Sequence, residues 1–375
     1  MEFEKYRLSQ LLTIKNGRDY KSLGQGSVPV FGSGGYMCSV DSYLYDRPSV
    51  LLPRKGTLSN IQYYDKGPFW TVDTCYYTIV DKNLVNSYYI YRYLRNLNLS
   101  GLDTGASIPS MTQKTYNGIK ILLPNLSIQH RIASILSTYD SLIENNTKRI
   151  RLLEKMAENL YKEWFVRFRF PGHENVEMEN GLPKGWKMTN LFDVADVTYG
   201  FAFKSNKFCD NAELNPVVRI RDIQENHTNT YTDEQCEDKY LIGKNAILIG
   251  MDGIFHMCLW NGERAYMNQR VVMLNSKEKG VCNYLLYLAI RPQIKYWEQV
   301  ISGTTVAHLG DKHLRKVKVL LPEKAILEKA NSIISRAMDE KNILQHQNSL
   351  LARQRDLLLP RLMSGKLEVK EELLE

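Results

Sequence analysis

The sequence has no long apolar run. Within its 375 residues no stretch approaches the ~20 consecutive apolar residues that span a bilayer, and the opening MEFEKYRLSQ contains no apolar segment of the kind found in signal peptides. The absence of both features predicts a cytoplasmic protein without a membrane segment.

Paired cysteines are also missing. The six cysteines are scattered without a C-x-x-C pair, which is typical of reduced thiols packed inside a protein. Five Cys and His residues of one half could in principle share a zinc ion, but their irregular spacing does not favour such a site. These five are Cys209, His227, Cys236, His256 and Cys258.

The motifs of nucleotide-driven and methyl-transferring enzymes do not occur. No G-x-x-x-x-G-K-[ST] is present, so no phosphate-binding P-loop is predicted. The glycine-rich residues 28–37, VPVFGSGGYM, fit neither G-x-G-x-x-G nor the F-x-G-x-G of amino-methyltransferases, and a strand leading into a turn is the better interpretation. Residues 215–218, NPVV, lack the second proline of the catalytic N-P-P-[FY] motif.

The isolated acidic residues and histidines form no recognisable catalytic pattern. The acidic residues have no nuclease-like spacing and are more typical of turns and caps, while His308 and His313 stand alone in a lysine-rich segment. We therefore expect no catalysis, no metal ion and no cofactor in this chain. The acidic residues considered are Asp73, Asp103, Asp222 and Asp252.

The overall composition is that of a folded protein with a basic surplus. The hydrophobic fraction of 43% and the charged fraction of 24% are near globular averages, and the length predicts two or three domains. Lys and Arg outnumber Asp and Glu by 49 to 41, giving a net charge of +8. This charge favours a polyanionic partner, although solvated basic surfaces are common in proteins that bind none.

The chain contains a long internal repeat. Residues 105–124, GASIPSMTQKTYNGIKILLP, resemble residues 303–322, GTTVAHLGDKHLRKVKVLLP, and Pro124 and Pro322 are 198 positions apart (322 − 124). Residues 5–22 likewise resemble residues 184–205. A period this long exceeds that of solenoid repeats and predicts a duplicated domain.

Each copy begins rich in strand-forming residues. Runs of Val, Ile, Tyr and Phe, broken by Gly, Pro, Asn and Asp, predict short strands. The clearest runs are residues 28–31, 75–80, 215–218 and 246–249.

Each copy ends in a predicted long helix. In the first helix one apolar stripe recurs every seven residues, with Ile135, Leu142 and Met156 filling the second heptad position, and Pro124 and Pro171 bracket it. The recurring residues are Ile132, Tyr139, Asn146, Leu153 and Leu160.

The second helix repeats this spacing between Pro322 and Pro360, and we expect Pro360 to break its last turn. Its recurring residues are Ala330, Ala337, Leu344, Leu351 and Leu358. About 40 residues make a rod of roughly 60 Å, which needs a partner along its length. The two helices either pair with each other, with Asn146 helping to fix their register, or each packs on its own domain.

These patterns predict an α+β protein with a pseudo-two-fold internal repeat. We expect a first β-rich domain at residues 1–124, a long helix at 125–170, a second β-rich domain at 171–322, and a long helix with a tail at 323–375.

The ordered set of repeated elements resembles the specificity subunits of type I restriction-modification systems. The resemblance covers nearly the whole chain and depends on order and duplication, because no single element is decisive. Its elements are the Leu-Leu-Pro junctions at Pro124 and Pro322, the aromatic openings at Tyr6 and Trp186, the G-x-x-[YF]-K-S turns at Gly17 and Gly200, and the loops at Gly105 and Gly303.

This resemblance implies a function and partners. Each β-rich unit would be a target-recognition domain that reads one half of a bipartite sequence in double-stranded DNA, and the two helices would form an antiparallel coiled-coil spacer. Two methyltransferase subunits, and in the restricting form two translocase-nuclease subunits, would assemble on the chain. Those partners would bind S-adenosylmethionine, ATP and Mg²⁺.

Candidate DNA contacts are polar and basic residues in loops near the repeat junctions, because phosphates are bound by cations and base edges by Arg, Gln and Asn. In the first half they are Tyr36, Arg54, Lys55, Thr57, Ser107, Ser110, Gln113 and Lys114. In the second half they are Arg219, Arg221, Asn268, Gln269, Arg270, Thr304, Thr305, His308 and Lys312.

Two other functional classes remain open. One is a fused methyltransferase or restriction enzyme whose catalytic part is not recognised, and the other is a coiled-coil adaptor without a role on DNA. Salt-dependent binding of duplex DNA would separate the adaptor from a DNA reader.

Overall fold

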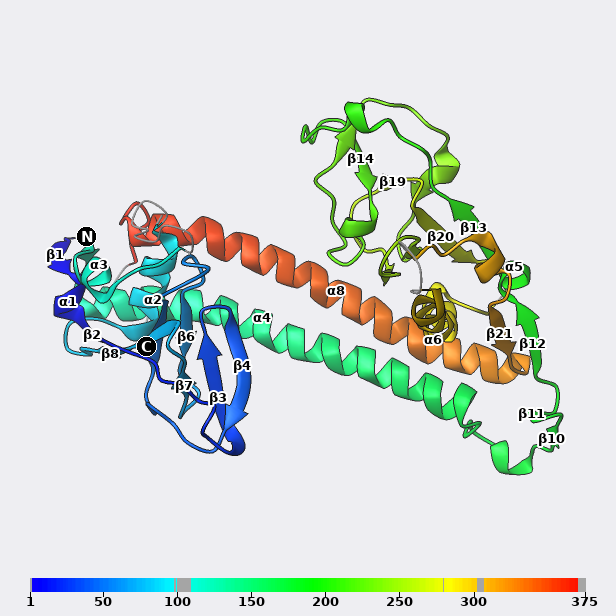
Figure 1. Ribbon diagram of the computed structural model, residues 1–375, viewed down its shortest axis with the longest axis horizontal. Helices are drawn as coiled ribbons and strands as arrows, with labels where there is room; N and C mark the ends of the chain where they lie inside the picture. Colours follow the sequence, from blue (N-terminus) through cyan, green and yellow to red (C-terminus); the bar gives the residue numbers. More distant parts are fainter. Residues whose placement is uncertain (1, 98, 100–108, 279, 302–306, 370–375) are drawn as a thin grey trace. The chain divides into compact units, whose positions relative to one another are not determined.

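The computed structural model describes residues 2–97, 99, 109–278, 280–301 and 307–369 (Figure 1). Its contacts divide the chain into two compact units, unit 1 with residues 1–145 and 347–375 and unit 2 with residues 146–346. Both units contain sheets and helices, which confirms the α+β class. The four-segment division stays a prediction, because the limits of the units lie inside the long helices.

Unit 1 is built on a four-stranded antiparallel sheet in the order β2-β8-β5-β6. A second sheet has the order β4-β3-β7, in which β3 and β7 are parallel, and β1 pairs with β9. The elements are β1 (Glu4–Arg7), α1 (Leu8–Leu11), β2 (Leu12–Lys15), β3 (Gln25–Gly32), β4 (Gly35–Val40), β5 (Ser49–Pro53), β6 (Gln62–Tyr64), β7 (Trp70–Thr71), β8 (Cys75–Val80), α2 (Ser87–Asn96), α3 (Gln113–Asn117) and β9 (Lys120–Leu123).

Unit 2 repeats this plan. Its antiparallel sheet has the order β13-β20-β17-β18, its second sheet the order β15-β14-β19-β16 with β14 and β19 parallel, and β12 pairs with β21. The elements are β10 (Met178–Glu179), β11 (Leu182–Pro183), β12 (Lys187–Asn190), α5 (Leu191–Val194), β13 (Ala195–Tyr199), β14 (Asn215–Val218), β15 (Tyr231–Thr232), β16 (Leu241–Ile242), β17 (Ile247–Gly250), β18 (Met257–Leu259), β19 (Ala265–Met267), β20 (Val271–Ser276), α6 (Asn283–Ile301), α7 (Asp311–Leu314) and β21 (Lys318–Leu321).

The duplication therefore holds for both sheets and for the closing strand pair, although unit 2 also has β10, β11 and β16, and the two aromatic openings are not equivalent residues. Tyr6 pairs with Ile121, and Thr189 pairs with Val319 in the repeated strand, so Thr189 rather than Trp186 is the equivalent of Tyr6. Trp186 precedes β12 and is buried, with its ring 4.9 Å from that of Phe170.

The middle strands of the antiparallel sheets form the centre of each core. Every residue of β5 and of β17 is buried, and their near-continuous apolar sequences are typical of strands covered on both faces. In unit 1 one cover is α2, whose Tyr89, Ile90 and Leu94 are fully buried.

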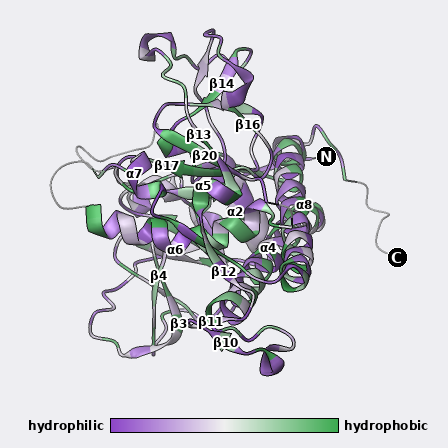
Figure 2. Ribbon diagram, turned by 90° about the vertical axis from the view of Figure 1, so that its right-hand side faces the viewer, coloured by the Kyte–Doolittle hydropathy of each residue, from purple (hydrophilic) through white to green (hydrophobic). Residues whose placement is uncertain are grey.

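The long helices are α4 (Leu126–Tyr161), which continues into a π-helical turn at Lys162–Val166, and α8 (Lys324–Met363). Figure 2 shows hydrophobic and hydrophilic residues interleaved along both. The seven-residue stripe of α4 is present, and beside it Leu136 and Ala157 are buried. The residues expected at the second heptad position, Ile135, Leu142 and Met156, are exposed.

The prediction that Pro360 ends the last helix is wrong. The helix passes through Pro360 to Met363. Proline removes one backbone hydrogen bond, but Leu359, Leu362 and Met363 are buried in the core of unit 1, and this packing holds the final turn.

The long helices pair with each other and also pack on the β-rich parts of the units. In unit 1 Arg355 of α8 donates to Asp140 of α4 at 2.7 Å, and Asn348 donates to the carbonyl of Ile143 at 3.5 Å, which gives an antiparallel pair. In unit 2 Arg149 pairs with Glu340 and Glu154 with Lys341, at 2.5 and 2.7 Å. Each helical segment also packs on the β-rich part of its own unit.

None of the helices in the described part of the chain combines the length and apolarity that a bilayer span requires.

Candidate nucleic-acid interface

In unit 1 three loop segments are joined into one surface, which we call platform 1 (residues 54–56, 74 and 109–111). Three backbone hydrogen bonds join them: Arg54 N–H to the Thr74 carbonyl at 2.8 Å, Gly56 N–H to Pro109 at 2.9 Å, and Met111 N–H to Arg54 at 3.0 Å. The segments meet because β5 ends beside the start of β8 in the antiparallel sheet.

Unit 2 contains the same arrangement, which we call platform 2 (residues 251–253, 270 and 307–309). Met251 N–H donates to Arg270 at 2.9 Å, Gly253 N–H to Ala307 at 2.9 Å, and Leu309 N–H to Met251 at 2.7 Å. The platforms share their backbone bonds and differ in their side chains.

At three equivalent positions the side chains of the two platforms are chemically different. An isolated bridge joins Lys55 to Ser110 in platform 1 and Asp252 to His308 in platform 2. These bridges make Lys55 equivalent to Asp252 and Ser110 to His308. The backbone bonds make Thr74 equivalent to Arg270.

Six of the predicted residues gather at platform 1 and the start of α3. Arg54 is partly committed to structure, because its guanidinium lies 5.9 Å from the Tyr76 ring centroid and donates to the carbonyl of Asp73 at 3.4 Å. Gln113 donates to Asn16 at 3.1 Å. Lys55, Thr57 and Lys114 are exposed and Ser110 is half-buried.

Tyr36 lies beside this surface on the hairpin of β3 and β4, which confirms the strand and turn expected at residues 28–37. Asn60 donates to the carbonyl of Ser33 at 2.7 Å and ties the hairpin turn to the loop that follows β5. The Tyr36 side chain is 63% exposed and therefore free to meet a partner.

At platform 2 a carboxylate lies between two predicted contacts. The Oδ1 atom of Asp252 is 2.7 Å from Nδ1 of His308, and its Oδ2 atom is 3.2 Å from Nε of Arg270. Gln269 and Lys312 are exposed nearby in sequence, at the turn after β19 and on α7.

Three other predicted residues of unit 2 are held by structure. The guanidinium of Arg219 lies 5.3 Å from the Phe208 ring centroid, and Arg221 forms an ion pair with Asp222 at 3.6 Å. Asn268 is 8% exposed, and its backbone bonds to Val218 and Val271 hold a turn. The Asn268 side chain is therefore largely covered by the protein, and its role as a DNA contact stays a prediction.

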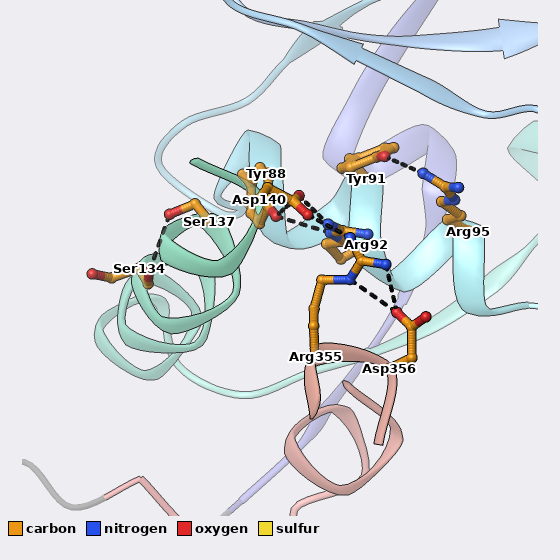
Figure 3. Close-up of polar contacts among 9 residues, drawn as sticks. All are labelled: Tyr88, Tyr91, Arg92, Arg95, Ser134, Ser137, Asp140, Arg355 and Asp356. Atoms are coloured by element: carbon orange, nitrogen blue, oxygen red, sulfur yellow. Dashed lines mark hydrogen bonds and ion pairs between the residues drawn. The ribbon is translucent and has the colours of Figure 1, made fainter. Parts of the chain in front are cut away.

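A charged cluster in unit 1 joins α2 to both long helices (Figure 3). Asp140 of α4 accepts hydrogen bonds from Tyr88 and Arg92 of α2 and from Arg355 of α8. Burial alone raises the pKa of Asp140, but the hydrogen bonds from Tyr88 and Arg355 and the charge of Arg92 outweigh it, so this pKa lies below its ordinary value.

The positions of unit 2 that are equivalent to Arg92, Asp140 and Arg355 are apolar. Equivalent positions are found by counting along each pair of matching helices from the first backbone hydrogen bond. The equivalent residues are Leu288 of α6, Met338 of α8 and Ala157 of α4. All three are buried in the core of unit 2. The charged cluster of unit 1 is therefore replaced by apolar packing at these three positions, while Arg291 of α6 forms its own ion pair with Glu158 of α4 at 2.7 Å.

Comparison with known proteins identifies the family. Residues 1–155 and 183–351 match the profile of the type I restriction modification DNA specificity domain, so the profile matches both copies of the repeat. The chain belongs to the type I restriction-modification DNA specificity family. DNA recognition within such a system is its function.

Individual members of the specificity family are distant in sequence. The MjaIX specificity subunit of Methanocaldococcus jannaschii is 25% identical over 88% of this chain and 79% of its own length. The EcoBI specificity subunit of Escherichia coli is 28% identical over 53% of this chain and 43% of its own. The crystal structure of a type I S subunit from M. genitalium shares the fold, with a TM-score of 0.68, 16% identity and 96% of each chain covered.

The sequence analysis missed two residues of the platforms in this specificity chain, and three of its predicted contacts have no described position. Ser107, Thr304 and Thr305 lie outside the described residues. Asp252 and Thr74 were missed as platform residues. Aligning the strand at 75–80 with the strand at 271–276 would have paired Thr74 with Arg270, whereas the match of Asp252 to Lys55 depends on the bridges across the sheet.

Two cysteines of the specificity chain, Cys75 and Cys258, are buried. Burial raises the pKa of the Cys75 and Cys258 thiols to about 12, which keeps them protonated and unreactive. In the part of the chain that the structure describes, no three His, Cys, Asp or Glu side chains converge where they could hold a metal ion.

Proposed function

We propose that the chain is a bipartite DNA reader in which platform 1 reads one half-site and platform 2 reads the other. The observation that carries this proposal is the pairing of an identical backbone framework with different side chains. A protein that reads two unrelated half-sites needs this combination, because docking on DNA is set by the framework and base identity by the side chains.

Affinity and specificity are assigned to different residues of each platform. Lys114 and Lys312 are equivalent, exposed and placed on the short helices α3 and α7, where they would neutralise phosphates. Gln113, Gln269 and Arg270 have the hydrogen-bonding groups that recognise adenine and guanine in the major groove.

Membership of the specificity family supports a proposal for the partners. Two methyltransferase subunits would assemble with this chain, joined in the restricting form by two translocase-nuclease subunits. S-adenosylmethionine, ATP and Mg²⁺ would be bound by those partners, and this chain would contribute no catalytic group. The complex would act on cellular DNA in the cytoplasm.

The test uses the chain purified with the methyltransferase subunit of its own system. Methylated positions are mapped on genomic DNA, and binding to the mapped duplex is measured over a range of salt concentrations. Lys114→Ala and Lys312→Ala should each weaken binding to all sequences alike and reduce the salt slope by about 0.9. Lys82→Ala and Lys244→Ala are matched controls, because these exposed lysines lie at the opposite ends of β8 and β17.

Three results would contradict the proposal. They are methylation without a bipartite target, an effect of the control lysines on binding as large as that of the platform lysines, and methyl transfer by the purified chain alone after trace partner subunits are removed. The last result would revive the fused-enzyme alternative.

A further inference from the structure

The carboxylate of Asp252 is the feature that most distinguishes platform 2 from platform 1. We propose that Asp252 is a positioning residue that aims Arg270 at a guanine of the half-site read by unit 2. This inference rests on the proposed function and adds the residue that sets specificity and the base that it selects.

Asp252 uses one oxygen for each neighbour. Oδ2 faces Nε of Arg270 at 3.2 Å, and Oδ1 faces Nδ1 of His308 at 2.7 Å. The side chain of Asp252 is 25% exposed, against 54% for Arg270 and 49% for His308. The Asp252 carboxylate is therefore less exposed than the Arg270 guanidinium and the His308 imidazole, and both of these groups remain accessible to a ligand.

The ion pair selects which edge of the guanidinium is presented. Asp252 lies on the Nε side of Arg270, and within the described residues the two terminal nitrogens Nη1 and Nη2 have no partner. Those terminal nitrogens form a fork of two parallel donors. A fork of this kind matches the O6 and N7 acceptors of guanine, the commonest specific contact in the major groove.

The same carboxylate orders His308. An ionised carboxylate only accepts hydrogen bonds, so Nδ1 of His308 carries the hydrogen that it donates to Asp252. In the neutral form of the ring this leaves Nε2 as an acceptor, which complements the amino groups of cytosine and adenine. Asp252 thereby fixes one donor group and one acceptor group side by side.

The backbone beneath these side chains is already fixed. Asp252, Arg270 and His308 belong to the three segments that the backbone bonds of platform 2 hold together. A reading group held by rigid segments loses less conformational freedom on binding and discriminates more sharply.

Platform 1 has no equivalent of the ion pair between Asp252 and Arg270. Its equivalent residues are Lys55, Thr74 and Ser110, which include no carboxylate and no guanidinium. The guanine preference set by Asp252 should therefore be confined to the half-site of unit 2.

The test maps methylated positions genome-wide for the complete complex carrying Asp252→Asn, Arg270→Ala or both substitutions. Asp252→Asn should relax the requirement for guanine at one position of one half-site by about tenfold. Arg270→Ala should relax the same position at least as much. The double variant should match Arg270→Ala, because Asp252 acts through Arg270. Arg270→Lys should also relax it, since lysine keeps the charge and loses the fork.

The matched control is Asp233→Asn, which removes the carboxylate of another exposed ion pair of unit 2, Lys207 with Asp233 at 3.2 Å. It should leave every position unchanged. The inference is overturned if Asp252→Asn changes no position, lowers methylation equally at all positions, or relaxes a position that Arg270→Ala leaves intact. A wild-type complex that shows no bipartite target would instead refute the proposed function.

Discussion

Two glycines, Gly17 and Gly200, hold equivalent close contacts in the two units. A Cβ atom added to Gly17 would lie 2.0 Å from the carbonyl oxygen of Val72, and one added to Gly200 would lie 2.0 Å from that of Asn268. Both carbonyls follow the strand that pairs in parallel with β3 or β14, so neither backbone can retreat without disturbing its sheet. The repeat of these glycines is therefore a requirement of packing.

Gly17→Ala and Gly200→Ala should each lower the free energy of unfolding by about 2 kcal/mol or more, because the inserted methyl group meets fixed backbone. Chemical denaturation followed by circular dichroism measures the change. Gly34→Ala is the matched control, since nothing lies within 4 Å of its added Cβ, and its effect should stay within about 0.5 kcal/mol. Equal effects at all three glycines would refute the packing argument.

At the scale of elements, the attachment of α2 to the long helices in unit 1 depends on Asp140. Arg92 is almost fully buried, with 3% of its side chain exposed, and Asp140 is its carboxylate partner. Asp140→Ala should cost roughly 3 kcal/mol, because it leaves a buried guanidinium without an anion. The triple substitution Arg92→Leu, Asp140→Met and Arg355→Ala copies the apolar trio of unit 2 and should stay within about 1 kcal/mol of wild type.

The same cluster should give unit 1 a dependence on acid pH. The pKa of Asp140 is lowered in the folded state, so its contribution to stability is present above the ordinary pKa of aspartate, near 4, and is lost as pH falls through the lowered value. Denaturation measured between pH 6 and about pH 2 should show a steeper loss for wild type than for the triple variant. Parallel curves would show that the cluster contributes nothing to the dependence on pH.

Elements differ in how well the sequence predicted them. Strands such as β8 and β14 follow from β-branched and aromatic runs, and the duplication follows from repeated order. The continuation of α8 past Pro360 did not follow, because burial of Leu362 and Met363 decides it and one sequence does not show that contact. The buried face of α4 also depends on tertiary packing, which is why Leu136 rather than Ile135 lies inside.

The candidate site was predictable only in part for a related reason. Lys55, Ser110 and His308 were found because they lie in polar loops near the repeat junction. Asp252 was read as a turn residue, since its equivalence to Lys55 depends on pairing across the sheet. Insertions change the spacing of the repeat before that point, so a constant offset of 198 does not reveal it.

At the scale of the whole molecule, duplication allows two readers to evolve separately. Each unit has its own antiparallel sheet, its own platform and its own closing strand pair, β1 with β9 in unit 1 and β12 with β21 in unit 2. The contacts of each unit with the long helices differ: the Asp140 cluster of unit 1 is replaced in unit 2 by buried apolar side chains, together with the ion pair of Arg291 and Glu158. Each unit therefore carries a complete platform of its own.

Exchange of one reader tests this independence. Replacing residues 187–321, from the first strand of the β12–β21 pair to the last, with the matching segment of another family member should change one half-site and leave the other intact. The reciprocal control replaces residues 4–123, bounded by β1 and β9, and should change only the opposite half-site. Methylated positions are mapped genome-wide for wild type and both exchanges, each with the methyltransferase partner. The two ends of each exchanged segment pair with each other as strands, so each segment carries its whole platform. If either exchange altered both half-sites together, the two platforms would have to be parts of one reading surface.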